Sequence, residues 1–118
     1  MIKIYGIPNC DVTQKSRAWL TGNKIGYVLH DYKKDGISVG KLKAWCGEVG
    51  WETLLNKRGT TWKGLPDATR LQVTGEQEAI RLMSEHTSLI KRPVIETGKK
   101  LLVGYNEQDY HKHIKNKK

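Results

Sequence analysis

Cys10 is the residue of this chain whose type and position are best suited to chemistry. It follows the chain breakers Gly6, Pro8 and Asn9, and it precedes a segment, residues 11–20, with the spacing of a helix. A helix N-terminus presents unpaired N–H groups and the positive end of the helix dipole, and both stabilise an anion. Because the thiolate is the reactive form of cysteine, this position predicts a nucleophile. The alternative is a small, buried, unreactive residue, as many free cysteines are.

Thr13 stands three residues after Cys10, where a dithiol oxidoreductase would carry its second cysteine. The Thr13 hydroxyl is expected to donate to the Cys10 thiolate from the first helical turn and so to favour the charged form. Without a local partner, an external thiol must resolve any mixed disulfide. Cys46, the other cysteine, lies on the apolar face of a predicted helix, so we interpret it as a structural, buried residue.

Arg58 and Arg92 form a second candidate group. Arg58 lies in a segment of Lys, Gly and Thr residues, and Arg92 directly precedes Pro93. A guanidinium stays charged and binds oxyanions with two parallel hydrogen bonds, so both residues are candidate anion ligands. The alternative is two surface arginines in a chain with 21 Lys and Arg residues.

Length and composition predict one cytoplasmic domain, residues 1–118, and we expect a monomer that binds no metal. Two cysteines make no disulfide framework, and no apolar run resembles a signal peptide or a membrane span. The net charge of +9 favours anionic partners or serves solubility. The basic tail, residues 111–118, is interpreted as a frayed, solvated end, with nucleic-acid binding or weak metal binding by His111 and His113 as alternatives.

The periodicity of apolar residues predicts an α/β order of elements. A strand, a helix and a strand are followed by a helical middle, and two strands and a helix close the chain. Ser38 is the expected cap of a helix that runs to about Val49, and Thr74 is expected to open another through a capping box. The predicted elements are residues 2–5, 11–20, 25–32, 38–49, 51–55, 74–86, 92–95, 101–103 and 106–114.

Five ordered blocks resemble the glutaredoxin-like arsenate reductase family, which also contains the Spx-type regulators, and most closely its small YffB-type members. The blocks are residues 6–11 (GIPNCD), 30–33 (HDYK), 50–62 (GWETLLNKRGTTW), 89–94 (LIKRPV) and 103–105 (VGY). Together they extend over nearly the whole chain. The resemblance implies a thioredoxin-like fold with a helical insertion at about residues 37–88.

The resemblance also implies a site and a reaction. Cys10 would be the redox nucleophile, flanked by Asn9, Asp11 and Thr13. Arg58 and Arg92 would bind an oxyanion or a glutathione carboxylate, and Pro93 would be a cis-proline beside the thiol. The function implied is a thiol reductase that uses one cysteine and takes glutathione as co-substrate, with no bound cofactor.

Two departures from the family pattern bear on function. Arsenate reductases of this type carry a third active-site arginine about a dozen residues after the Arg-Pro pair, but residues 99–110 contain none, which argues against efficient arsenate reduction. Most Spx-type redox switches carry a second cysteine where this chain has Thr13. The alternative function is an Spx-type regulator that binds RNA polymerase and leaves Cys10 idle.

Overall fold

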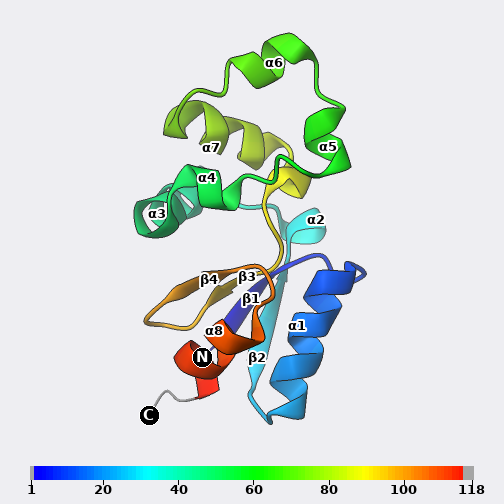
Figure 1. Cartoon of the computed structure of the whole chain (residues 1–118), viewed down its shortest axis with the longest axis vertical. Helices are drawn as coiled ribbons and strands as arrows, with labels where there is room; N and C mark the ends of the chain where they lie inside the picture. The colour runs from blue at the N-terminus through cyan, green and yellow to red at the C-terminus, as the bar shows by residue number, and fades with distance from the viewer. Residues whose placement is uncertain (1, 116–118) are drawn as a thin grey trace. The chain divides into compact units, whose positions relative to one another are not determined.

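The chain folds into two compact units, seen in a computed structural model that describes residues 2–115 (Figure 1). The first unit comprises the chain up to Asp35 and from Arg92 onward, and the second comprises Gly36–Lys91. Among residues 2–115, no helix is long and apolar enough to cross a membrane.

The first unit is built on a four-stranded sheet of order β2-β1-β3-β4. Strand β1 (Ile2–Gly6) pairs in parallel with β2 (Tyr27–Asp31), through the crossover helix α1 (Asp11–Gly22). It pairs antiparallel with β3 (Val94–Glu96), which forms a hairpin with β4 (Leu101–Val103). The βαβ and ββα halves confirm the predicted α/β, thioredoxin-like fold.

Short helices follow β2 and β4. The short helix α2 (Tyr32–Asp35) continues directly from β2 and includes Tyr32, which was predicted to end the strand. Helix α8 (Glu107–Tyr110) is capped by Asn106, whose Oδ1 accepts from the Asp109 N–H at 3.0 Å. A π-helical turn, His111–Lys115, continues it, so the tail is not frayed as far as Lys115. Residues 116–118 lie outside the described part.

The buried face of α1 includes polar residues. Thr13, Ser16 and Leu20 are fully buried, whereas Val12 is 37% exposed. The Ser16 Oγ lies 2.9 Å from the Tyr110 hydroxyl, and this hydrogen bond fixes α1 against α8. The sheet contributes the other large apolar residues of this core, among them Ile2, Ile4, Ile95 and Leu102.

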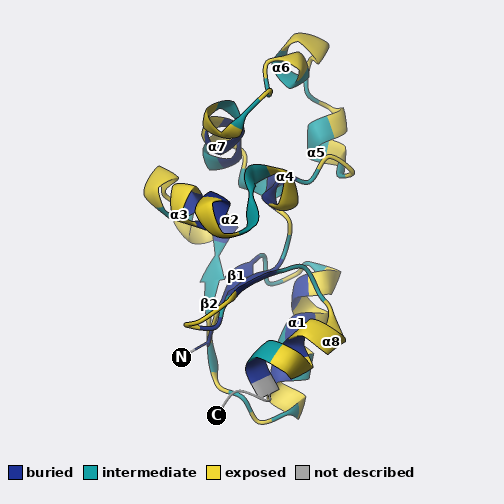
Figure 2. Ribbon diagram, turned by 60° about the vertical axis from the view of Figure 1, so that its left-hand side comes forward, coloured by how far each residue is buried: buried dark blue, intermediate teal, exposed yellow. Residues whose placement is uncertain are grey.

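The second unit is helical, and its two longest helices, with the segments around residues 54–55 and 89–90, carry its buried residues (Figure 2). Helix α3 (Val39–Val49) begins at Ser38, whose Oγ accepts from the Lys41 N–H at 3.1 Å. It buries Leu42, Trp45 and Cys46, and these positions pack against α7 (Glu76–Glu85). The remaining elements are α4 (Trp51–Leu54), α5 (Thr60–Lys63), α6 (Asp67–Leu71) and a 3-10 turn, Thr87–Leu89.

The predicted capping box of α7 is wrong. The N-cap is Gly75, which has no side chain to accept a hydrogen bond, and the helix begins at Glu76. The backbone N–H of Thr74 instead donates to the carbonyl of Gln72, which places Thr74 in the preceding turn. Acidic residues in the first turn, Glu76 and Glu78, stabilise this end through the helix dipole.

Candidate functional site

Cys10 is the N-cap residue of α1, at the carboxyl end of β1. Its backbone is extended, with φ −83° and ψ 129°, and its carbonyl accepts the first helical hydrogen bond, from Gln14, at 2.9 Å. A tight turn precedes it, in which the Cys10 N–H donates to the carbonyl of Ile7 at 3.0 Å. The side chain is half-buried and makes no disulfide. The thiol therefore lies where the first N–H groups of α1 are unpaired.

The pKa of the Cys10 thiol is lowered from its ordinary value by the groups around it. Partial burial is the largest single influence and raises the pKa, because it disfavours the charged form. It is outweighed by the groups of the first helical turn that can donate to the thiolate, namely the Thr13 and Val12 backbone N–H groups and the nearby Thr13 hydroxyl, together with the charge of Arg92. The thiolate is thus favoured by its place at the helix end more than by any single cation.

Thr13 is held under this turn by close packing. It is fully buried, and its Oγ1 forms no hydrogen bond of ordinary geometry with a described residue. The hydroxyl therefore has no competing acceptor when the Cys10 thiolate forms. A Cβ at Gly6 would come within 2.6 Å of the same Oγ1, so only glycine at position 6 leaves Thr13 in place.

Arg92 and Pro93 lie at the same edge of the sheet as Cys10, although they are far from it in sequence. Strand β3 runs antiparallel to β1, so its amino end, which follows Pro93, lies beside the carboxyl end of β1. The Arg92–Pro93 peptide bond is cis, and the Pro93 carbonyl accepts from the Gly104 N–H at 2.8 Å. The charge of Arg92 acts on Cys10 and lowers the pKa of its thiol.

Asn9 and Asp11 flank Cys10 in sequence, and both are exposed. Asp11 occupies the first turn of α1, where a carboxylate is stabilised by the helix dipole. Within the described part of the chain, neither side chain makes a recorded hydrogen bond. Their predicted role in binding a ligand stays a prediction.

Arg58 belongs to the helical unit, so its predicted meeting with Cys10 stays a prediction. It lines a pocket of about 370 Å³ together with Glu52, Leu55, Asn56, Lys57 and Lys91. Its backbone N–H donates to the Asn56 Oδ1 at 3.1 Å.

The sequence did not single out Lys57 or Lys91, which share the Arg58 pocket. The Nζ of Lys57 lies 5.6 Å from the ring centroids of both Trp51 and Trp62, within range of cation–π attraction. Trp51 and Trp62, which precede and follow the Lys57–Arg58 pair in sequence, were the available signal for a cation–π contact of Lys57. No local pattern indicated Lys91, which follows thirty-three residues after Arg58.

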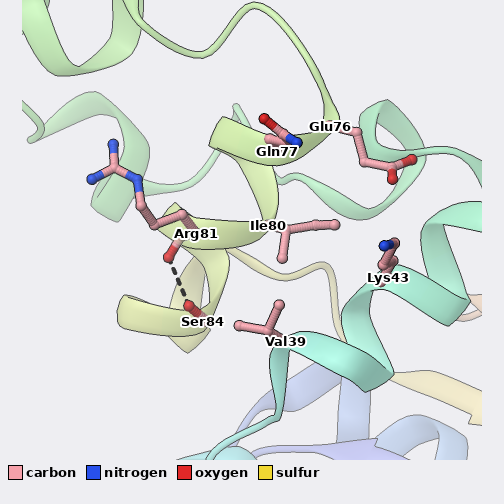
Figure 3. Close-up of a pocket in the computed structure, with 7 residues that line it drawn as sticks. All are labelled: Val39, Lys43, Glu76, Gln77, Ile80, Arg81 and Ser84. Atoms are coloured by element: carbon pink, nitrogen blue, oxygen red, sulfur yellow. Dashed lines mark hydrogen bonds between the residues drawn. The ribbon is translucent and has the colours of Figure 1, made fainter.

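A second pocket of the helical unit contains none of the predicted site residues. It has a volume of about 440 Å³ and lies between α3 and α7, with Val39 and Ile80 facing each other across it (Figure 3). Lys43 and Glu76 lie at one end of the view, and the guanidinium of Arg81 points away from them. Elsewhere too, residues 2–115 bring together no three His, Cys, Asp or Glu side chains as metal ligands.

The two cysteines differ in exposure and acidity, which predicts different reactivity. Cys46 is 5% exposed, and burial, with the nearby charge of Glu76, raises the pKa of its thiol to about 11. The rate at which iodoacetamide alkylates Cys10 should rise with pH, because only the thiolate reacts. The midpoint of this rise should lie below the free-cysteine pKa of about 8.5. Cys46 should react far more slowly in the folded protein. A Cys10 midpoint at or above the free value would contradict thiolate stabilisation.

Comparisons with known proteins agree on one family. The model of the ArsC family matches residues 5–113. An uncharacterised protein of Haemophilus influenzae is 39% identical over 110 residues, which cover 93% of this chain and 96% of that protein. The global transcriptional regulator Spx of Bacillus subtilis is 29% identical over 119 residues, covering 99% of this chain and 89% of the regulator.

Two solved structures are similar in both fold and sequence. A YffB protein is 42% identical, with a TM-score of 0.93, and the match covers 97% of this chain and 99% of the other. An arsenate reductase (ArsC) related protein from Brucella melitensis is also 42% identical, with a TM-score of 0.75 and coverage of 97% and 94%.

Proposed function

The chain belongs to the ArsC family, and from this membership we propose that it is a glutathione-dependent thiol oxidoreductase with Cys10 as its single nucleophile. The observation that carries the proposal is the lowered pKa of Cys10 at the N-cap of α1, where Thr13 and Arg92 favour the thiolate. An unreactive buried cysteine would show the opposite shift, as Cys46 does.

The proposed reaction proceeds in three thiol–disulfide exchanges. The Cys10 thiolate attacks one sulfur of an oxidised substrate disulfide, a new S–S bond joins that sulfur to Cys10, and the other sulfur leaves as a thiolate. A glutathione thiolate then attacks the Cys10 sulfur of the adduct, releases the second substrate thiolate and leaves Cys10 joined to glutathione. A second glutathione thiolate attacks the glutathione sulfur of that bond, forms glutathione disulfide and returns Cys10 to the thiolate. Overall, two glutathione molecules supply two electrons and end as glutathione disulfide.

The two arginines have distinct places in this proposal. Arg92 acts on the Cys10 sulfur and stabilises negative charge there as the thiolate forms and as it is regenerated. Arg58 binds a carboxylate or an oxyanion of the substrate or of glutathione. An oxidised thiol is preferred over arsenate as substrate, because residues 99–110 supply no third arginine.

Treatment with glutathione disulfide is expected to give one stable mixed disulfide per chain, at Cys10. No cysteine stands at position 13 to displace the glutathione, and Cys46 is buried with a raised pKa. Intact-mass spectrometry, followed by peptide mapping, measures both the number of adducts and their site. A Cys10–Cys46 disulfide would contradict this single-cysteine mechanism and would favour a redox switch.

The alternative function is regulatory. Relatives at 25–30% identity over most of this chain are global transcriptional regulators named Spx. In that case the partner would be RNA polymerase, and Cys10 would take no part. A glutathione-coupled disulfide reduction assay separates the two functions: turnover by the wild-type protein supports the oxidoreductase, and its absence together with polymerase binding supports the regulator.

A further inference from the structure

The pocket around Arg58 is formed by two short segments that lie far apart in sequence. One carries Glu52, Leu55, Asn56, Lys57 and Arg58, and the other contributes Lys91. An antiparallel bridge between Leu55 and Ile90 joins them. All of these residues belong to the helical unit, so the pocket is complete within it.

Backbone hydrogen bonds hold the pocket walls in register. The Asn56 N–H donates to the Leu89 carbonyl at 2.7 Å, and the Lys91 N–H donates to the Leu54 carbonyl at 2.8 Å. Leu54, Leu55, Leu89 and Ile90 are all nearly fully buried. The polar residues that line the pocket therefore extend from a rigid apolar base, which reduces the ordering cost of binding.

The charges that line the pocket are mixed in sign. Lys57, Arg58 and Lys91 are cations, and Glu52 is a carboxylate. Within residues 2–115, none of the four has a recorded ion pair. Lys57 is positioned over the faces of Trp51 and Trp62, whereas Arg58 and Lys91 have no such aromatic contact within the described residues. A ligand that matches this set carries carboxylate and ammonium groups close together.

We propose that this pocket binds the γ-glutamyl end of glutathione, whose α-carboxylate and α-ammonium are attached to one carbon. Arg58 and Lys91 take the carboxylate, and Glu52 accepts from the ammonium. The volume of about 370 Å³ is within the range of small-molecule sites. A simple oxyanion would pair with the cations but would leave Glu52 without a partner. This inference rests on the proposed glutathione dependence and assigns a binding place to one end of that co-substrate.

The test uses the full chain with Cys10→Ser and S-methylglutathione as probe, so that no thiol chemistry contributes to binding. Affinity is measured by titration of the tryptophan indole N–H signals in NMR spectra, because Trp51 and Trp62 contact Lys57.

Arg58→Gln is expected to weaken binding of the probe roughly tenfold. Glu52→Gln should weaken S-methylglutathione but strengthen pyrophosphate, since it removes an acceptor for the ammonium and a repulsion for the anion. Arg81→Gln, an exposed arginine of α7 outside this pocket, is the matched control and should leave the affinity unchanged.

Two results would overturn the inference. If Glu52→Gln strengthens both ligands, the pocket is a plain anion site. If Arg58→Gln and Glu52→Gln leave S-methylglutathione affinity unchanged, glutathione binds elsewhere. The proposed function is tested separately. If the wild-type protein binds S-methylglutathione through Glu52 and Arg58 but reduces no disulfide with glutathione, the pocket assignment stands and the proposed reaction is wrong.

Discussion

Replacing Cys10 with serine is expected to lower the rate of glutathione-coupled disulfide reduction by at least about 1,000-fold. A serine hydroxyl is not ionised near neutral pH and forms no stable adduct with sulfur, so every exchange of the proposed reaction is lost. Because Cys10 is only half-buried and makes no side-chain cap to α1, the folded state should keep its stability. Turnover is measured by following glutathione disulfide formation, and stability by urea unfolding.

Cys46→Ala is the matched control for this experiment. It removes the other thiol from a buried position of α3 and should retain turnover, at a cost in stability of about 1 kcal/mol for the lost buried sulfur. If Cys10→Ser keeps its activity, the nucleophile is another group and the proposed mechanism is wrong. Loss of activity in Cys46→Ala alone would point to a two-cysteine reaction.

Arg92→Ala is expected to raise the pKa of Cys10 and to lower kcat/KM roughly 10- to 100-fold near neutral pH. The charge of Arg92 favours the thiolate, so its removal shifts the alkylation midpoint upward and reduces the thiolate fraction at pH values below the new pKa. At pH well above the raised pKa, the thiolate fraction of the variant should approach that of the wild type. Any deficit that remains at high pH then measures lost anion binding.

Arg92→Lys separates charge from geometry. A lysine keeps the positive charge, so the pKa of Cys10 should stay lowered, but it cannot bind an oxyanion with two parallel hydrogen bonds. Arg81→Ala, an exposed arginine of the helical unit, controls for the change in net charge. An unchanged alkylation midpoint in Arg92→Ala would show that Arg92 does not act on the thiolate.

Local sequence was sufficient to predict the α/β order of elements and the setting of Cys10, whereas the thioredoxin-like fold was implied by the family resemblance. The breakers before Cys10 and the helical spacing after it place the thiol at an N-cap, and this depends on about twenty neighbouring residues. The apolar face of the predicted helix likewise indicated that Cys46 is buried, which the structure confirms. Features of this kind are encoded in adjacent turns of one element.

Features that depend on tertiary contacts were not predicted. Lys91 shares a pocket with Arg58 only because the Leu55–Ile90 bridge joins two segments, and bridges between single residues leave no periodic signal. The buried face of α1 includes Thr13 and excludes Val12, because that face is fixed by close contact with Gly6 and by the bond between Ser16 and Tyr110. In α7, Gly75 took the cap position that Thr74 was expected to hold.

The position of β1 between β2 and β3 has a consequence for how the chain folds during synthesis. One neighbour of β1 ends at Asp31, but the other begins only at Val94, after the whole helical unit has been made. The helical unit is contiguous in sequence and is complete by Lys91, so it is able to fold first. Until β3 leaves the ribosome, one edge of β1 has no strand to pair with, and open edges of this kind promote aggregation. If the ribosome stalls while it synthesises the helical unit, Cys10 therefore lies beside a sheet that still lacks β3 and β4.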